Sequence, residues 1–259
     1  MFTNLLGGAD HDAAAHFARI SPSDVTIYAH LHELIVSLKQ HGIWPQIEVL
    51  CVAHDNEADS LLNLTGGTDS TKTGTPTFVA NTGFECVAGT DVIDLNIAMS
   101  SASLYDTDDH HLINYVTNTT VGSNTTALYS FDSGAPFGFQ NEGIIRAGST
   151  SVSFYNLGVS LSVSVGGAAG SAEKGFLGMC ATTASARAAR VNDTENTGVA
   201  TSGSTKLTTN FICKGGDTGS ADQTHHACWG IGGPLTATQL GLYENAIRKY
   251  AQARGFDVY

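Results

Sequence analysis

Charge is scarce in this sequence. Only 14% of its 259 residues are Asp, Glu, Lys or Arg, against about 25% in an ordinary soluble domain. The sequence has 12 Lys and Arg residues and 24 Asp and Glu residues, which gives a net charge of −12. Because binding to a phosphate backbone needs clustered basic side chains, this shortage excludes nucleic acid from the expected partners.

Long hydrophobic runs and a targeting signal are also missing. No apolar stretch approaches the roughly 20 residues of a membrane span, so we expect no membrane insertion. The stretch MFTNLLGGADHD lacks the basic and apolar regions of a secretory signal, and we therefore expect a soluble protein made in a cytosol. In that compartment the five Cys residues, which form no CxxC pair, are expected to be free thiols, although Cys213 and Cys228 could bridge.

The first 60 residues contain an amphipathic helix. Ser21 is a suitable N-cap, Pro22 suits the first helical position, and Asp24 would oppose the helix dipole. Apolar residues then recur at steps of three and four as far as Gly42, which predicts about five turns with one buried face.

A second helix is predicted over residues 236–254. Thr236 and Gln239 have the T-x-x-Q spacing of a capping box, and Gly255 occupies the position of a left-handed C-terminal cap. An apolar stripe that includes Leu240, Tyr243 and Tyr250 requires that one face of this helix be buried.

From about residue 61 the pattern changes to short apolar stretches separated by Gly, Asn, Asp and Thr clusters. In LGVSLSVSVGG, four aliphatic residues alternate with Ser160, Ser162 and Ser164, which is the period of a strand with one buried face. The spacing predicts a mainly β protein, an antiparallel β-sandwich. We expect an N-terminal helical segment over residues 1–60 and a sandwich over 61–259 that is closed by the C-terminal helix.

Three stretches carry a family resemblance: LIVSLKQHGIWPQIEVLCVAHDNEADSLLNL, GTPTFVANTGFECVAGTDVIDL and CWGIGGPLTATQLGLYENAIRKYAQARG. Together they resemble a group of bacteriophage and prophage virion proteins that contain a concanavalin A-like (lectin/glucanase) jelly-roll domain. The resemblance implies a jelly-roll sandwich preceded by a helix and closed by another. It also implies a place on the virion, assembled in a bacterial cytoplasm, with other virion proteins as partners and a host-surface polysaccharide as ligand.

Catalytic patterns are weak. The E-x-D-x-x-E strand of the glucanase relatives is absent, and Asp193 and Glu195 lie among turn-forming residues that favour a solvated loop over a catalytic pair. There is no G-x-S-x-G elbow and no phosphate-binding G-K-[ST] sequence. We therefore expect no enzyme activity, no catalytic residues and no cofactor. A polysaccharide hydrolase or lyase on the same fold is the alternative.

Two histidine pairs are weighed as metal ligands. His110 and His111 follow three Asp residues in YDTDDHHL, but neighbours on a strand point to opposite faces, so we expect a solvated turn before strand LINYV and no metal. His225 and His226 are expected in a polar loop. Trp44 and Trp229 lie beside apolar residues and are expected to pack in the core rather than stack on sugars.

A polar strand surface remains as the candidate site. Tyr155, Asn156, Ser160, Ser162 and Ser164 could hold a glycan through an array of hydroxyl and amide hydrogen bonds, although an ordinary solvent-facing strand explains the same pattern. The expected function is a non-enzymatic virion structural protein, such as a head spike, decoration or tail-fibre component, that binds host glycans as a homo-oligomer. A purely architectural capsid or tail protein without ligand is the remaining alternative.

Overall fold

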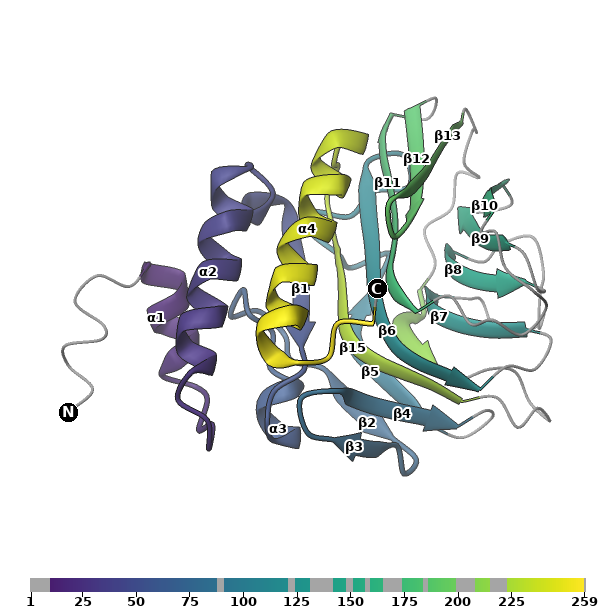
Figure 1. Cartoon of the computed structure of the whole chain (residues 1–259). Coiled ribbons are helices and arrows are strands. Elements are labelled where there is room, and N and C mark those ends of the chain that lie inside the picture. The colour runs from purple at the N-terminus through teal and green to yellow at the C-terminus, as the bar shows by residue number, and fades with distance from the viewer. Residues whose placement is uncertain are drawn as a thin grey trace.

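The structure is a computed structural model of the whole chain. It describes residues 10–87, 91–120, 124–130, 142–147, 151–156, 159–164, 174–183, 186–198, 208–214 and 223–258. Two antiparallel β-sheets lie face to face, and helices cover the outer face of one of them (Figure 1). The mainly β antiparallel sandwich with terminal helices that the sequence predicts is confirmed.

The first sheet carries the helices. Its strands in spatial order are β13 (Thr194–Gly198), β12 (Ala186–Val191), β11 (Gly175–Thr183), β6 (His110–Thr120), β15 (Gln223–Gly232), β4 (Gly83–Val87) and β3 (Thr77–Val79). A further strand, β1 (Ile47–Val52), pairs with β15 outside this order. Residues 1–60 thus supply a strand to this sheet, while the expected division at residue 60 stays a prediction.

The second sheet forms the other half of the sandwich. Its strands in spatial order are β10 (Val159–Ser164), β9 (Ser151–Asn156), β8 (Glu142–Ala147), β7 (Asn124–Ser130), β14 (Asn210–Lys214), β5 (Val92–Ala98) and β2 (Thr71–Thr73). Between the sheets lies a core of alternating inward side chains from both, among them Leu112, Phe154 and Trp229. The alternation of apolar and polar residues in the sequence therefore marks strands whose apolar side chains face the core between the sheets.

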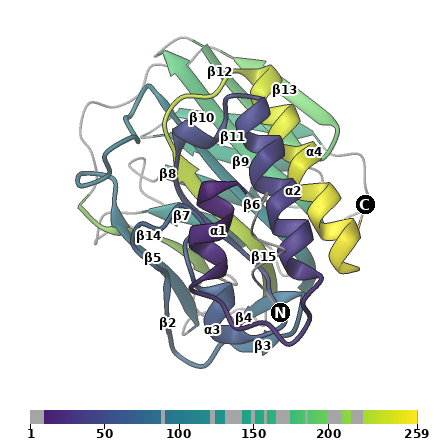
Figure 2. The same ribbon diagram turned by 90° about the vertical axis from the view of Figure 1, so that its left-hand side faces the viewer.

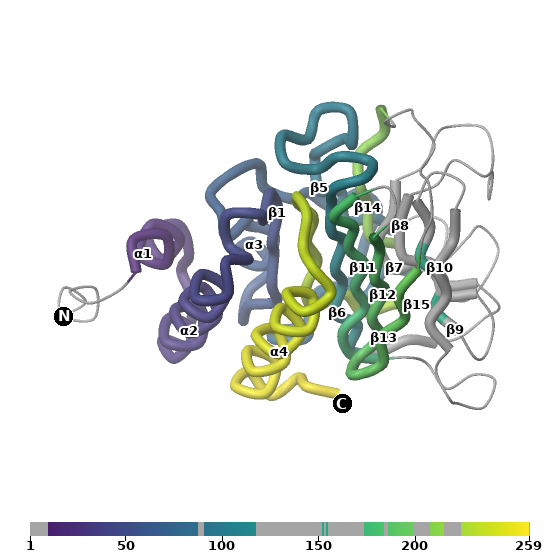
Figure 3. Tube along the Cα trace, turned by 90° about the horizontal axis from the view of Figure 1, so that it is seen from above, coloured from purple at the N-terminus to yellow at the C-terminus, as the bar shows by residue number. Residues whose placement is uncertain are grey.

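The helices form layers outside the first sheet. The sequence elements are α1 (His11–Phe17), α2 (Ile27–Gln40), the 3₁₀ turn η2 (Trp44–Gln46), α3 (Glu57–Ser60) and α4 (Ala237–Arg254). Seen from the helical side, α4 and α2 run next to each other across the strands, and α1 lies on α2 (Figure 2). From above, the layers follow one another from α1 through α2 and α4 to the two sheets (Figure 3). None of the described helices is long and apolar enough to cross a membrane.

The predicted capping of α4 is confirmed. The Thr236 hydroxyl accepts a hydrogen bond from the Gln239 backbone N–H at 3.2 Å, and the Gln239 side chain accepts one from the Thr236 N–H at 3.0 Å. Gly255 ends the helix in the left-handed conformation, with φ of 78°. Leu240, Tyr243 and the rest of the apolar stripe are buried against the first sheet.

The predicted start of the first long helix is wrong. Its N-cap is Thr26, so Ser21, Pro22 and Asp24 precede it. Asp24 Oδ1 accepts a hydrogen bond from the Thr26 N–H at 2.9 Å, and the Asp24 N–H donates to Asp55 at 2.7 Å. Short polar side chains that bond nearby backbone groups compete with helical hydrogen bonds, and this competition moves the helix start by five residues. The predicted end is correct, since Gly42 has φ of 67° directly after the helix.

The apolar face of α2 is fully used within the chain. Ile27, Leu31, Leu34, Ile35 and Leu38 are each at most 2% exposed and belong to the core that also contains the buried face of α4. Because this face is covered inside one chain, it is not available for a contact between subunits.

Buried thiols and tryptophans follow the sequence prediction in most respects. All five Cys residues are free and buried, and burial raises the pKa of Cys51, Cys86 and Cys180 to about 12. Trp229 is fully buried, as expected. Trp44 is half-buried instead, with its indole N–H donating to Asp12 at 2.9 Å.

Candidate functional site

The candidate glycan-binding residues lie on the hairpin of β9 and β10, at one edge of the second sheet. The backbone register pairs Ser160 with Tyr155, and the adjacent pair joins Val159 with Asn156. Ser162 and Ser164 continue along β10. The structure therefore brings the five residues onto one two-stranded ladder, while their side chains lie outside the described residues.

The register adds two residues that sequence reasoning missed. Ser162 pairs with Ser153, and Ser164 pairs with Ser151. Three hydroxyl pairs thus alternate along the hairpin with the apolar pairs Leu161 with Phe154 and Val163 with Val152. Directly opposite residues of an antiparallel pair share one face of the sheet. The period-two pattern of SVSFYN could have identified both residues. We call the three hydroxyl pairs the hydroxyl ladder.

A groove of about 510 Å³ opens on the other side of the sandwich, where β11, β12 and β13 meet the start of α4. Small residues line much of it, among them Ala186, Ala188 and Gly198, and Thr182, Thr197 and Thr236 supply hydroxyl groups. Volumes of about 300–1,000 Å³ are typical of small-molecule sites. No sequence motif marks this groove, because its walls come from four separate elements.

Charge in the groove wall is limited to one residue. Arg187 is the charged residue among the described lining residues, and its side chain, 5% exposed, forms an ion pair with Asp108 at 3.2 Å. A glycosidase of the usual kind needs two carboxyl groups that flank the substrate. The described lining of the groove holds no carboxyl group, so these residues do not supply such a pair.

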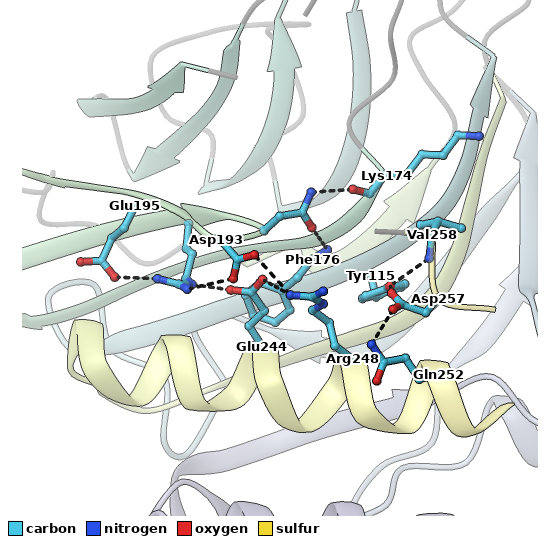
Figure 4. A network of polar contacts seen from close by, with 12 residues as sticks. Tyr115, Lys174, Phe176, Asp193, Glu195, Glu244, Arg248, Gln252, Asp257 and Val258 are labelled. Atoms are coloured by element: carbon cyan, nitrogen blue, oxygen red, sulfur yellow. Dashed lines mark hydrogen bonds and ion pairs between the residues drawn. The ribbon is translucent and has the colours of Figure 1, made fainter. Parts of the chain in front are cut away.

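The acidic residues Asp193 and Glu195 belong to a network of ion pairs beside α4 (Figure 4). Arg190 lies between Glu195, at 3.2 Å, and Glu244 of α4. Arg248 of α4 contacts Asp193 at 3.4 Å. Glu195 lies in strand β13 rather than in the predicted loop. Both carboxylates therefore help to fasten α4 to the β12–β13 hairpin.

Within this network Glu244 is fully buried. Burial raises the pKa of its carboxyl group, and the hydrogen bond from Arg190 acts in the opposite direction. Taking a carboxylate out of water is costly unless a partner with good geometry compensates. The Arg190 guanidinium supplies that partner, with its Nε donating to the carboxylate.

The predicted positions of both histidine pairs are wrong. His110 and His111 begin β6 and are fully buried, and His225 and His226 lie within β15 rather than in a loop. His111 bonds the Gly233 carbonyl at 2.7 Å. Burial lowers the pKa of His110 and His226 to about 3 and that of His111 to about 4. Neutral imidazole rings can be buried within a sheet. The sequence prediction failed because it treated these histidines as polar residues.

Metal ligands do not gather in the part of the chain that the structure describes. No three His, Cys, Asp or Glu side chains there come close enough to hold an ion together. The two neighbouring His side chains of β6 point to opposite faces of the sheet. His110 stacks on Tyr105 with 4.8 Å between ring centroids, and His111 contacts Tyr243 of α4 with 5.7 Å between ring centroids.

Sequence comparisons give no relatives: no family model and no curated protein matches this chain. Solved structures do match it. The binding domain of botulinum neurotoxin DC in complex with SialylT is 10% identical over 78% of this chain, with a TM-score of 0.52. The Trypanosoma rangeli sialidase in complex with sialic acid is 11% identical over 79% of this chain, with a TM-score of 0.54.

A third match is the binding domain of Paraclostridial Mosquitocidal Protein 1, 10% identical over 77% of this chain with a TM-score of 0.54. This chain spans about half of the two binding-domain chains, 51% and 52%, and 34% of the sialidase. At such low identity the similarity establishes the β-sandwich fold and leaves the ligand to be tested.

Proposed function

We propose that this chain is a non-enzymatic, glycan-binding structural protein of a bacteriophage or prophage virion, used as a head spike, decoration or tail-fibre component. The observation that carries the glycan-binding part is the hydroxyl ladder on β9 and β10, in which one Ser–Tyr pair and two Ser–Ser pairs occupy every second position of the hairpin. Arrays of hydroxyl groups match the hydrogen bonding of sugars.

Two further observations support this function. The chain shares its sandwich fold with proteins whose structures were solved with SialylT and with sialic acid. Its net charge of −12 disfavours nucleic acid as the alternative ligand. The virion part of the proposal depends on the sequence resemblance of both ends of the chain to phage proteins. We further propose a homo-oligomer with other virion proteins as neighbours.

Binding to polysaccharide tests the glycan part. The full chain is titrated with purified bacterial surface polysaccharides and with sialylated oligosaccharides in a calorimeter. The ladder variant Tyr155→Ala/Ser160→Ala should lose at least tenfold in affinity, because each lost hydrogen bond contributes about 1 kcal/mol. Thr73→Ala, a hydroxyl loss on the opposite edge strand of the same sheet, is the matched control and should bind like the parent.

The groove provides the competing location. Ala186→Trp would fill it from an exposed position on β12. If this variant loses binding while the ladder variant retains it, the ligand lies in the groove and the ladder proposal is wrong. If neither bacterial polysaccharides nor sialylated oligosaccharides bind at millimolar concentration, the architectural alternative is preferred.

Two more measurements address the rest of the proposal. A reducing-sugar assay on the same polysaccharides tests for hydrolysis, and released ends would replace the proposal with the hydrolase or lyase alternative. Mass spectrometry of purified particles from a host that carries the sequence tests the virion role. Absence of the chain from those particles would overturn that role without affecting the glycan result.

A further inference from the structure

Two histidines meet where the N-terminal helix docks on the rest of the molecule. His16 of α1 is 1% exposed, and His54, which follows β1, is fully buried. The centroids of their rings are 5.7 Å apart. None of the four ring nitrogens has a hydrogen-bond partner among the described residues. Buried polar atoms nearly always have partners, so this pair needs an explanation.

The pair is surrounded by charges that are already engaged. Five charged groups act on the two rings: Arg19, Asp59 and Asp69 act on His16, and Asp55 and Arg254 act on His54. Each of the three carboxylates accepts hydrogen bonds from other groups. Asp59, for example, accepts one from the Ser21 N–H at 2.8 Å, and Asp69 is paired with Arg19 at 2.5 Å. Arg19 opposes a positive charge on His16 and Arg254 opposes one on His54, whereas the carboxylates favour such a charge. Both arginines are themselves paired with carboxylates, so burial has the largest effect on both rings.

The helix that carries His16 is held by few contacts. α1 has seven residues, of which Ala13, His16 and Phe17 are buried. Its first turn is fixed to α2 and η2 by ion pairs of Asp10 and Asp12 with Lys39 and by the Trp44 hydrogen bond. A helix this short is not stable by itself. Segments with few buried contacts open at a smaller free-energy cost than the core.

We propose that the His16–His54 pair is an acid-sensitive latch: it holds α1 on the body while both rings are neutral, and acid releases α1. The docked pair disfavours a positive charge on either ring in this buried site. A protonated His16 would face the His54 imidazole and the Arg19 guanidinium, and a protonated His54 would face the Arg254 guanidinium. Release exposes His16 to water and uncovers the ring of His54 that it contacts. Both rings can then be protonated.

The direction of the effect follows from the proton balance. Burial, with the neighbouring His54 as the next cause, lowers the pKa of His16 to about 3, and burial lowers that of His54 to about 4. An exposed His has a pKa of about 6.5. Between these limits the released state binds up to two more protons than the docked state. Acidification below about pH 6.5 therefore favours release, and pH changes above about 7.5 have little effect.

Hydrogen exchange of the full chain measures this release. The probe is the protection of the α1 amides at pH 8.0 and pH 5.5, corrected for the intrinsic exchange rates. With two histidines the opening equilibrium should rise about 100-fold over this range. His16→Phe and His54→Phe should each reduce the rise to about tenfold, and the double variant should abolish it. Phe replaces the buried ring with one of similar size that cannot be protonated.

The matched control is His11→Gln, because His11 lies on the same helix with its side chain 95% exposed. This variant should keep the full 100-fold rise. Amides of β6 report global opening, which acidification also favours, so the latch requires a smaller opening free energy for α1 than for β6 at both pH values. The latch is refuted if α1 protection in the parent is independent of pH, if the α1 amides open only together with those of β6, or if His11→Gln removes the effect.

Discussion

Mild acid should destabilise the whole fold, because five histidines are buried in neutral form: His16, His54, His110, His111 and His226. Burial is the largest cause of the lowered pKa of each, to about 3 or 4. The unfolded chain binds a proton at each of these residues with a pKa of about 6.5. Because the folded pKa lies below the unfolded one, the contribution of these histidines to stability is complete above about pH 7.5 and is lost as the pH falls through 6.5.

The magnitude follows from the linkage relation. Between pH 7 and pH 5, each such histidine removes about 1.9 kcal/mol from the free energy of unfolding, so the five together remove about 9 kcal/mol. This loss is comparable with the total stability of about 5–15 kcal/mol of a typical domain. Carboxylates with lowered pKa, such as Asp24 at about 2, lose their contribution only below this range. The raised pKa of Glu244 offsets part of the loss, because acid relieves the burial of its charge.

The assay is guanidinium denaturation, followed by circular dichroism, at pH 7 and pH 5. His110→Phe supplies the test of cause, since the new ring can still pack against Tyr105. Whatever its effect at pH 7, this variant should lose about 2 kcal/mol less than the parent on acidification. A parent protein that loses less than about 2 kcal/mol in total between the two pH values would refute the reasoning. A variant with the same pH dependence as the parent would do so as well.

Four further predictions concern stability at pH 7, and urea denaturation measures all of them. Thr236→Ala removes the hydroxyl of the capping box and should cost about 1 kcal/mol. Glu244→Ala leaves the Arg190 guanidinium, whose side chain is 16% exposed, without its buried partner and should cost about 2–3 kcal/mol; an unchanged midpoint would show that Glu195 alone suffices. Gly255→Ala meets no atom within 4 Å and should cost about 1 kcal/mol. Gly83→Ala would place its Cβ 2.0 Å from a backbone oxygen and should prevent folding.

Local signals in the sequence predicted part of the fold. The T-x-x-Q box and Gly255 fix both ends of α4 because their hydrogen bonds lie within one turn of the helix. Strict alternation predicted β10 for the same reason, since a strand with one buried face needs no distant information. Such elements are specified by neighbours in sequence.

The errors arose where distant residues decide the local conformation. Ser21 has the residue type of an N-cap, but its N–H donates to Asp59, which is 38 residues away. His226 lies in a polar stretch of the sequence, but in the sheet it is the register partner of Phe84 in β4, and its ring forms a hydrogen bond with the Asn114 side chain. The residues next to Ser21 and His226 in the sequence do not indicate these distant partners. The candidate ladder could be predicted from alternation, whereas the groove required the packing of α4.

The position of β15 has a consequence for synthesis on the ribosome. This strand pairs with β1, β4 and β6, yet it follows all of them in chain order, and α4 follows it. A nascent chain that stops before residue 223 therefore lacks the shared neighbour of three earlier strands. Pairing between segments so far apart is slow to form. The sheet can be completed only after translation has passed β15, and until then the waiting strand edges need protection from aggregation.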